Sequence, residues 1–195
     1  MSIFTLINIF MTVLLSTNDL ATAIRKLAND LHASHRDLSS VIFAGIQQGG
    51  AILGARIMEV LQTLNPDQQV QYGQLDITFY RDDIRKEIIA PDTMNMPFNI
   101  ENKTVGLIDD VLFTGRTIRA AMDALMAFGR PAKVELLVLI DRRFSRQFPI
   151  EPDYTGQAID TTVNDKVQVE WKESGSKDGV WLVSEIKSKT NGKAK

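Results

Sequence analysis

Short apolar runs alternate with stretches of helical periodicity through most of the chain. Short apolar runs, as in buried strands, occupy 41–44 and 104–108, and a nearly continuous one occupies 134–140. Apolar residues spaced for one face of a helix occur in 18–31, 52–61 and 118–125. Strand and helix in this repeated order predict an α/β fold, with a mainly parallel central sheet flanked by helices and right-handed crossovers between strands.

Turn and capping residues mark the expected helix ends. Thr17 or Asn18 is expected to cap the first helix, and Thr117 the last. Gly129 and Pro131 follow the last helix in the order typical of a helix end. These residues predict where the first and last helices begin and where the last one ends.

Three other regions complete the expected domain. Residues 70–80 alternate as in a half-buried strand, with a hairpin turn at Gly73 as an alternative. Residues 167–171 and 180–186 predict a late antiparallel pair, the small β-containing part of the fold. The polar segment 81–102 is either a flexible lid over a site or a plain surface excursion, and the pattern leaves both open.

The two ends of the chain differ from its middle. Residues 1–15 form an apolar N-terminal extension that is too short to span a bilayer and lacks the basic residues of a secretory signal. We expect a strand or a partner-covering segment there, with Met1 or Met11 as the start. Residues 16–185 form the expected domain, and the Lys-rich residues 186–195 a disordered basic tail.

Composition and charge narrow the class of protein. The 195 residues suit one domain with a substantial core, and the 44% hydrophobic and 24% charged content is ordinary for a globular protein. The absence of cysteine excludes disulfides and thiol chemistry, and we expect a cytoplasmic protein. A net charge of −2 argues against a large nucleic-acid footprint, although a local basic patch could still bind a small RNA.

Candidate chemistry concentrates in residues 104–125. Asp109 and Asp110 are expected where the apolar strand ends, and the small-residue turn 114–117 then leads into a helix. Backbone N–H groups at a helix N-terminus suit a phosphate, and carboxylates suit sugar hydroxyls or a hydrated metal. Each fragment alone is more often a solvated strand end or a plain helix cap. Together they predict a ribose 5-phosphate site.

A second strand, glycine-rich loop and helix lie earlier in the chain. The loop reads Gly45, Ile46, Gln47, Gln48 and Gly49. This layout also suits an anion, although a simple strand-to-helix connection explains such a loop more often.

Four stretches of sequence resemble the PyrR family, the bifunctional pyrimidine operon regulators and uracil phosphoribosyltransferases with a type I phosphoribosyltransferase fold. IDDVLFTGRTIRAA at 108–121 is similar to the superfamily's signature for phosphoribosyl pyrophosphate (PRPP). The others are LDITFYRDD at 75–83, AMDALMAFGRPAKVELLVLIDR at 121–142 and FPIEPDYTGQAIDT at 148–161. The resemblance covers roughly residues 19–172.

The resemblance implies an enzyme that converts uracil and PRPP into UMP and pyrophosphate with Mg²⁺. It assigns PRPP phosphate and ribose to Asp109, Asp110, Val111, Leu112, Phe113, Thr114, Gly115, Arg116 and Thr117. It assigns pyrophosphate to residues 45–49, and Arg81 in the flexible loop would join the two aspartates in catalysis. Uracil would lie beside Phe113, Asp141, Arg142 and Arg143. It indicates no direct protein ligand for the metal.

Several positions depart from the family pattern. Gln47, Gln48 and Gly49 stand where the family loop usually carries a basic residue, so weak catalysis is expected. Phe113 replaces the aspartate with which 6-oxopurine enzymes contact their base, which disfavours a purine substrate.

The alternative function is a UMP-responsive RNA-binding attenuator of pyrimidine genes with weak or no catalysis. Asn29, Glu151 and Gln157 replace residues that are more often basic or His in the family, so we expect RNA affinity to be low. Both the family and the apolar N-terminus suggest a homodimer or a higher homo-oligomer, with no membrane partner.

Overall fold

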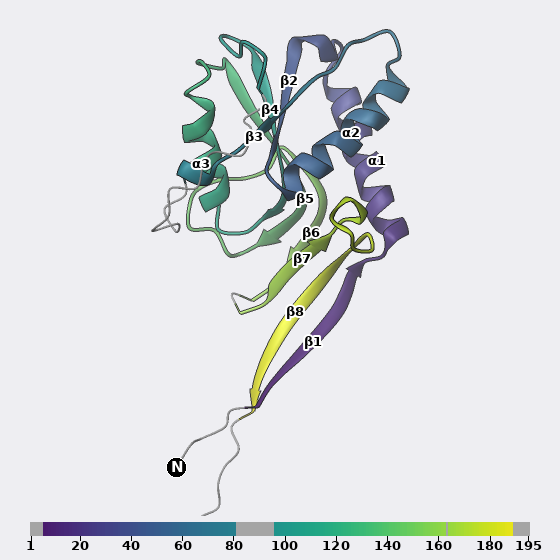
Figure 1. Ribbon diagram of the computed structural model, residues 1–195, viewed down its shortest axis with the longest axis vertical. Helices are drawn as coiled ribbons and strands as arrows, with labels where there is room; N and C mark the ends of the chain where they lie inside the picture. The colour runs from purple at the N-terminus through teal and green to yellow at the C-terminus, as the bar shows by residue number, and fades with distance from the viewer. Residues whose placement is uncertain (1–5, 81–95, 163, 189–195) are drawn as a thin grey trace, which may run out of the picture.

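The computed structural model describes residues 6–80, 96–162 and 164–188 (Figure 1). Its centre is a five-stranded sheet in the order β3-β2-β4-β5-β6, and every neighbouring pair is parallel. The strands are β2 (Val41–Ile46), β3 (Gln71–Leu75), β4 (Thr104–Leu112), β5 (Lys133–Arg143) and β6 (Tyr154–Asp160). The expected α/β fold with a parallel central sheet is confirmed.

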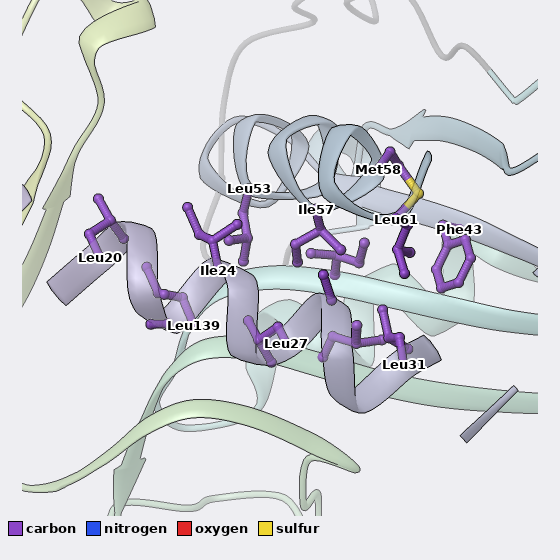
Figure 2. Packing of buried hydrophobic residues seen from close by; sticks show 14 of the residues in the cluster. Leu20, Ile24, Leu27, Leu31, Phe43, Leu53, Ile57, Met58, Leu61 and Leu139 are labelled. Carbon is purple, nitrogen blue, oxygen red and sulfur yellow. The ribbon is translucent and has the colours of Figure 1, made fainter. Parts of the chain in front are cut away.

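Two helices cover one face of this sheet. They are α1 (Thr17–Ser34) and α2 (Gly49–Leu64). Figure 2 shows their apolar side chains meeting above the sheet, and Leu27, Leu31, Phe43, Ile57 and Leu61 are all fully buried. Burial of each such side chain contributes roughly 1.5–3 kcal/mol, so this layer holds the strands that carry the site.

The opposite face is covered by a third helix, α3 (Arg116–Leu125) (Figure 1). Its buried residues Ala121 and Leu125 join Val105, Leu107 and Leu136 of the sheet in a second apolar cluster. Because both faces are covered, the central strands read as nearly continuous apolar runs.

A separate three-stranded antiparallel sheet has the order β1-β8-β7. Its strands are β1 (Leu6–Leu15), β7 (Lys166–Glu170) and β8 (Gly179–Ser188). β1 and β8 pair over nearly their whole length and extend away from the helices as a ribbon (Figure 1). Three short 3₁₀ helices complete the description: η1 (Leu38–Ser40), η2 (Thr78–Tyr80) and η3 (Lys172–Ser174).

The predicted β segments are partly right. The antiparallel pair of 167–171 and 180–186 is confirmed as β7 and β8, and the apolar N-terminus contains a strand. The hairpin at Gly73 is wrong, because β3 runs straight through it, parallel to β2. Strand β6 was not predicted, since its sequence carries no apolar alternation. Residues 186–188, expected to begin the disordered tail, continue β8.

The predicted caps also need correction. Ser16 caps α1, in a reciprocal arrangement in which its side chain and that of Asp19 each bond the other's backbone N–H. Thr117 is the second residue of α3, and the capping position belongs to Gly115. α3 ends at Leu125, before the Gly129 and Pro131 that were expected to stop it. Within the described residues, no helix combines the length and apolarity needed to cross a membrane.

Candidate active site at the carboxyl end of β4

Strand β4 carries the acidic pair further into the sheet than predicted. The strand does not end at Asp109 but runs to Leu112, so both aspartates are strand residues. The chain then turns through residues 113–115 into α3. Gly115 has φ 87°, a left-handed conformation that glycine adopts without a Cβ penalty. The turn therefore places the N-terminus of α3 next to the carboxyl end of β4.

A cavity of about 320 Å³ opens at this turn. It is lined by Asp109, Val111, Leu112, Phe113, Thr114, Gly115, Arg116 and Thr117. The structure therefore gathers eight of the nine residues predicted to hold PRPP around one space. A concave space with a carboxylate on one wall and helix N–H groups on another can accept a sugar phosphate.

Asp110, the ninth predicted residue, does not line this cavity. A Cβ placed on Gly49 would come within 1.9 Å of Asp110 Oδ2, and one on Gly50 within 2.3 Å of the carbonyl oxygen of Ile108. The glycine-rich loop thus lies directly on the carboxyl end of β4. The two predicted loops are neighbours, and Asp110 is at their junction while Asp109 faces the cavity.

Burial changes the acidity of this junction. Desolvation raises the pKa of Asp110 above its ordinary value, and hydrogen bonds from the backbone N–H groups of Asp110 and Val111 only partly offset the effect. Asp109 Oδ1 accepts a hydrogen bond from the backbone N–H of Asp110 at 3.0 Å. The junction is therefore a place where an approaching cation or hydroxyl group is favoured.

Arg146 stabilises the turn 113–115, and it was not among the site residues predicted from the sequence. It forms an ion pair with the buried Asp141 and donates to the carbonyl oxygens of Phe113 at 2.6 Å and Ile150 at 2.9 Å. A single guanidinium thus links the turn after β4 to the segment after β5. The one sequence signal for this residue is the basic character of 142–146, with three arginines in five residues.

Further contacts hold the turn between β4 and α3 in place. The carbonyl oxygen of Thr114 accepts hydrogen bonds from the backbone N–H groups of Gln147 and Phe148, at 2.9 and 3.2 Å. Arg116 Nε donates to Gln147 Oε1 at 2.7 Å. The turn is therefore preorganised by residues 146–148, which lie about thirty positions further along the chain.

The predicted uracil-side residues have three different environments. Arg142 is buried, its guanidinium lies 3.7 Å from the centre of the Phe113 ring, and it donates to Thr161 Oγ1 and to two carbonyl oxygens nearby. Asp141 is buried against Arg146. Arg143 is exposed and paired with Asp160 at 2.8 Å. Arg142 therefore fixes the ring of Phe113 rather than reaching into solvent.

The predicted pyrophosphate loop borders a larger hollow. Gln47 and Gln48, joined by a cis peptide bond, line a cavity of about 500 Å³ with residues of α2 and η3. Arg56 also lines it, but Glu173 holds its guanidinium at 2.5 Å and Asp178 at 2.7 Å. This cation therefore does not replace the basic residue that the loop lacks.

Two predicted elements remain without a structural test. Arg81 and most of the predicted lid, residues 81–95, lie outside the described residues. Among the residues described, no three His, Asp or Glu side chains gather as a ready-made metal site.

Comparison with known proteins places this geometry in a family. A phosphoribosyl transferase domain model matches residues 12–174. A relative from Microcystis aeruginosa, called "Bifunctional protein PyrR", is 40% identical over 171 residues, which is 87% of this chain and 96% of the relative. The chain belongs to the PyrR family. Another PyrR protein, from Ligilactobacillus salivarius, is 41% identical and covers 82% of this chain and 91% of its own.

Solved structures support the fold. A hypoxanthine phosphoribosyltransferase from Trypanosoma cruzi superposes with a TM-score of 0.68, covering 88% of this chain and 94% of its own at 16% identity. A hypoxanthine-guanine phosphoribosyltransferase from Bacillus anthracis gives 0.65 over 90% and 99% at the same identity. The PyrR chain therefore has the phosphoribosyltransferase fold, as predicted. At this identity the likeness shows the fold alone.

Proposed function

We propose that this PyrR-family protein transfers the phosphoribosyl group of PRPP to uracil, giving UMP and pyrophosphate, in pyrimidine salvage. The observation that carries the proposal is the cavity of about 320 Å³ at the end of β4, which is lined both by Asp109 and by the first residues of α3. Its lining coincides with the signature expected to hold a ribose 5-phosphate. The name "bifunctional" of the relatives agrees with a protein that combines two activities.

The proposed binding follows from the two sides of the cavity. The N–H groups of residues 115–117 point at the 5-phosphate, where the helix dipole favours negative charge. Asp109 accepts hydrogen bonds from the ribose hydroxyls. The loop 45–49 meets β4 beside Asp110, and this adjacency supports binding of pyrophosphate next to the anomeric carbon.

The reaction needs no covalent intermediate with the protein. The bond between the anomeric carbon and pyrophosphate breaks, and its electron pair leaves with the pyrophosphate oxygen. The N1 lone pair of uracil forms the new bond, and the N1 proton is lost to solvent or to pyrophosphate. The protein positions both reactants and stabilises the cationic sugar with the carboxylate of Asp109, which lines the cavity.

Mg²⁺ fits the donors at this site. The carboxylate oxygens of Asp109 and Asp110 are the hard ligands it prefers, and the absence of a third acidic or His partner among the described residues suits a cation held largely by substrate oxygens and water. When bound, Mg²⁺ would neutralise charge on the pyrophosphate leaving group. No protein side chain is assigned as a direct ligand of the metal.

Base selectivity rests on Phe113. Its ring is held by Arg142 at 3.7 Å and offers no hydrogen-bond acceptor to a purine N7 or N1 position. A flat apolar surface suits the smaller uracil ring, with its polar edge read by backbone groups near residues 141–145.

RNA attenuation is the second function that the family suggests. Asn29, Glu151 and Gln157 are exposed, and none of them supplies positive charge. We therefore expect only weak, strongly salt-dependent binding to a pyrimidine leader stem-loop. Nanomolar binding of such an RNA at physiological salt would instead favour RNA attenuation over catalysis as the main function.

The test of catalysis is UMP formation from labelled uracil, PRPP and Mg²⁺ with the purified chain. Hypoxanthine serves as the matched competitor base. UMP formed from uracil, with no nucleotide formed from hypoxanthine, is the expected result. No UMP at saturating substrates would refute the proposal, even if UMP itself were bound.

A further inference from the structure

Strand β1 leaves one long edge of the small sheet open. In the order β1-β8-β7 it is the outermost strand, and in the part of the chain that the structure describes nothing pairs with its other side. β7 reaches β8 only along residues 179–183, so the outer half of the ribbon consists of β1 and β8 alone. An open edge offers backbone N–H and C=O groups to another strand.

Exposed apolar side chains lie on both faces of β1. Phe10, Met11 and Val13 are 53%, 56% and 58% exposed, and because neighbouring strand residues point to opposite faces, neither face is covered. The ten residues of β1 include no charged side chain. The outer half of β8, by contrast, carries Glu185 and Lys187. Charges on an edge strand oppose pairing with another chain, and β1 lacks them.

The order of polar and apolar residues in β1 is symmetric about Phe10. Its only polar residues are Asn8 and Thr12, two positions to either side. If two copies of β1 pair antiparallel with Phe10 facing Phe10, each Asn8 faces a Thr12 and every other position from 7 to 13 pairs apolar with apolar. A shift of one residue in either direction places both polar residues opposite apolar ones.

The outer part of β1 precedes the match to the family model. The phosphoribosyl transferase model begins at residue 12, so Phe10 and Met11 lie before the matched residues. An isolated two-stranded ribbon is marginal in water, and a bare apolar one needs a cover.

We propose that β1 pairs antiparallel with β1 of a second copy, with Phe10 on the two-fold axis. The two small sheets then form one six-stranded sheet across the dimer. The interface is isologous, because the same strand supplies both sides. The pairing of the two copies does not depend on catalysis and would form whether or not the protein makes UMP.

The absence of cysteine makes a direct test simple. In the Phe10→Cys variant the two thiols would face each other across an antiparallel pair, with Cα atoms about 4.5 to 5.5 Å apart. A disulfide accepts Cα separations of about 4.4 to 6.8 Å. We expect mild oxidation of the full chain to give a disulfide-linked dimer in most molecules on non-reducing gels.

Two matched variants distinguish this pairing from chance collision. Val13→Cys places a thiol of similar exposure on the same strand, but its copies would lie about 20 Å apart in the proposed register. Met126→Cys places one on a 50% exposed site after α3. Both should remain monomeric on the gel. A failure of Phe10→Cys to cross-link, or equal cross-linking by either control, would overturn the proposal.

A second variant measures the association itself. Met11→Lys introduces an ammonium group into the proposed interface, and sedimentation should show self-association weakened by at least about tenfold, because an unpaired charge resists burial. Met126→Lys is the matched control and should associate as the unaltered chain does. Unchanged association of Met11→Lys would place any dimer on another surface.

Discussion

Replacing Gly115 with alanine tests whether the turn before α3 holds phosphate. The chain contains an internal control, because Gly115 (φ 87°, ψ 0°) and Gly175 (φ 82°, ψ 8°) have almost the same backbone conformation. A Cβ on Gly115 would meet Ile150 at 3.2 Å and Phe148 at 3.3 Å, whereas one on Gly175 would meet nothing within 4 Å. The two variants therefore share their backbone strain and differ in surroundings.

The expected magnitudes follow from this geometry. A non-glycine residue in the left-handed region costs roughly 1–2 kcal/mol, so each variant should melt about 2–8 °C lower in a chain of this size. Gly115→Ala must also move the turn by a few tenths of an ångström, which misdirects the N–H groups of residues 115–117. Losing one hydrogen bond to a charged phosphate costs about 1.5–3 kcal/mol, or roughly tenfold to a hundredfold in UMP affinity.

Calorimetry of both variants separates the two effects. Differential scanning should give lowered melting temperatures for both variants, with Gly115→Ala at or below Gly175→Ala because its Cβ is crowded. Titration with UMP should show weakened binding for Gly115→Ala alone. Unaltered UMP affinity in Gly115→Ala, or an equal loss in Gly175→Ala, would refute the assignment of this turn to the phosphate.

Three further substitutions test the rest of the site. Gly49→Ala puts a Cβ 1.9 Å from Asp110 Oδ2 and should lower kcat/KM for PRPP at least about tenfold in the uracil assay. Burial raises the pKa of Asp110, so folding stability falls as pH rises through the raised pKa; Asp110→Asn should raise the melting temperature at mildly alkaline pH while reducing activity. Arg146→Lys loses the fork to two carbonyl oxygens and should cost about 1–3 kcal/mol in urea unfolding.

Each of these has a matched comparison. Gly179→Ala crowds Trp181 at 2.5 Å, far along the chain from Asp110, and should leave activity intact. The melting difference between Asp110→Asn and the parent should vanish at pH values where the carboxyl is protonated in both folded and unfolded chains. Arg143→Lys alters an exposed ion pair and should change stability by no more than about 0.5 kcal/mol. Equal losses in variant and control would contradict the corresponding reasoning.

The parallel core was predictable because burial on both faces leaves a plain mark on the sequence. The runs 104–108 and 134–140 are apolar apart from Thr104 and Glu135, and they form the adjacent strands β4 and β5. Strand β6 was not predictable in this way. It lies at the edge of the sheet, its residues are mostly exposed or half-buried, and long-range pairing with β5 rather than its own pattern makes it a strand.

The site shows the same division. The residues that line the cavity are nearly contiguous in the sequence, so all of them fall within the motif. The motif also includes Asp110, which does not line the cavity. Arg146 was missed because its role depends on two carbonyl oxygens and a carboxylate that come together only in the fold. The adjacency of Gly49 and Asp110 is likewise a contact across sixty positions, and no local spacing encodes it.

The pairing of β1 with β8 has a consequence for biosynthesis. The apolar strand emerges from the ribosome early, but its partner begins only at Gly179. At roughly 5–20 residues per second, the intervening chain takes about 10 to 30 seconds to translate. During that interval the nascent strand is exposed to chaperones and to neighbouring nascent chains on the same messenger RNA. The yield of folded protein in vivo should therefore depend on translation speed.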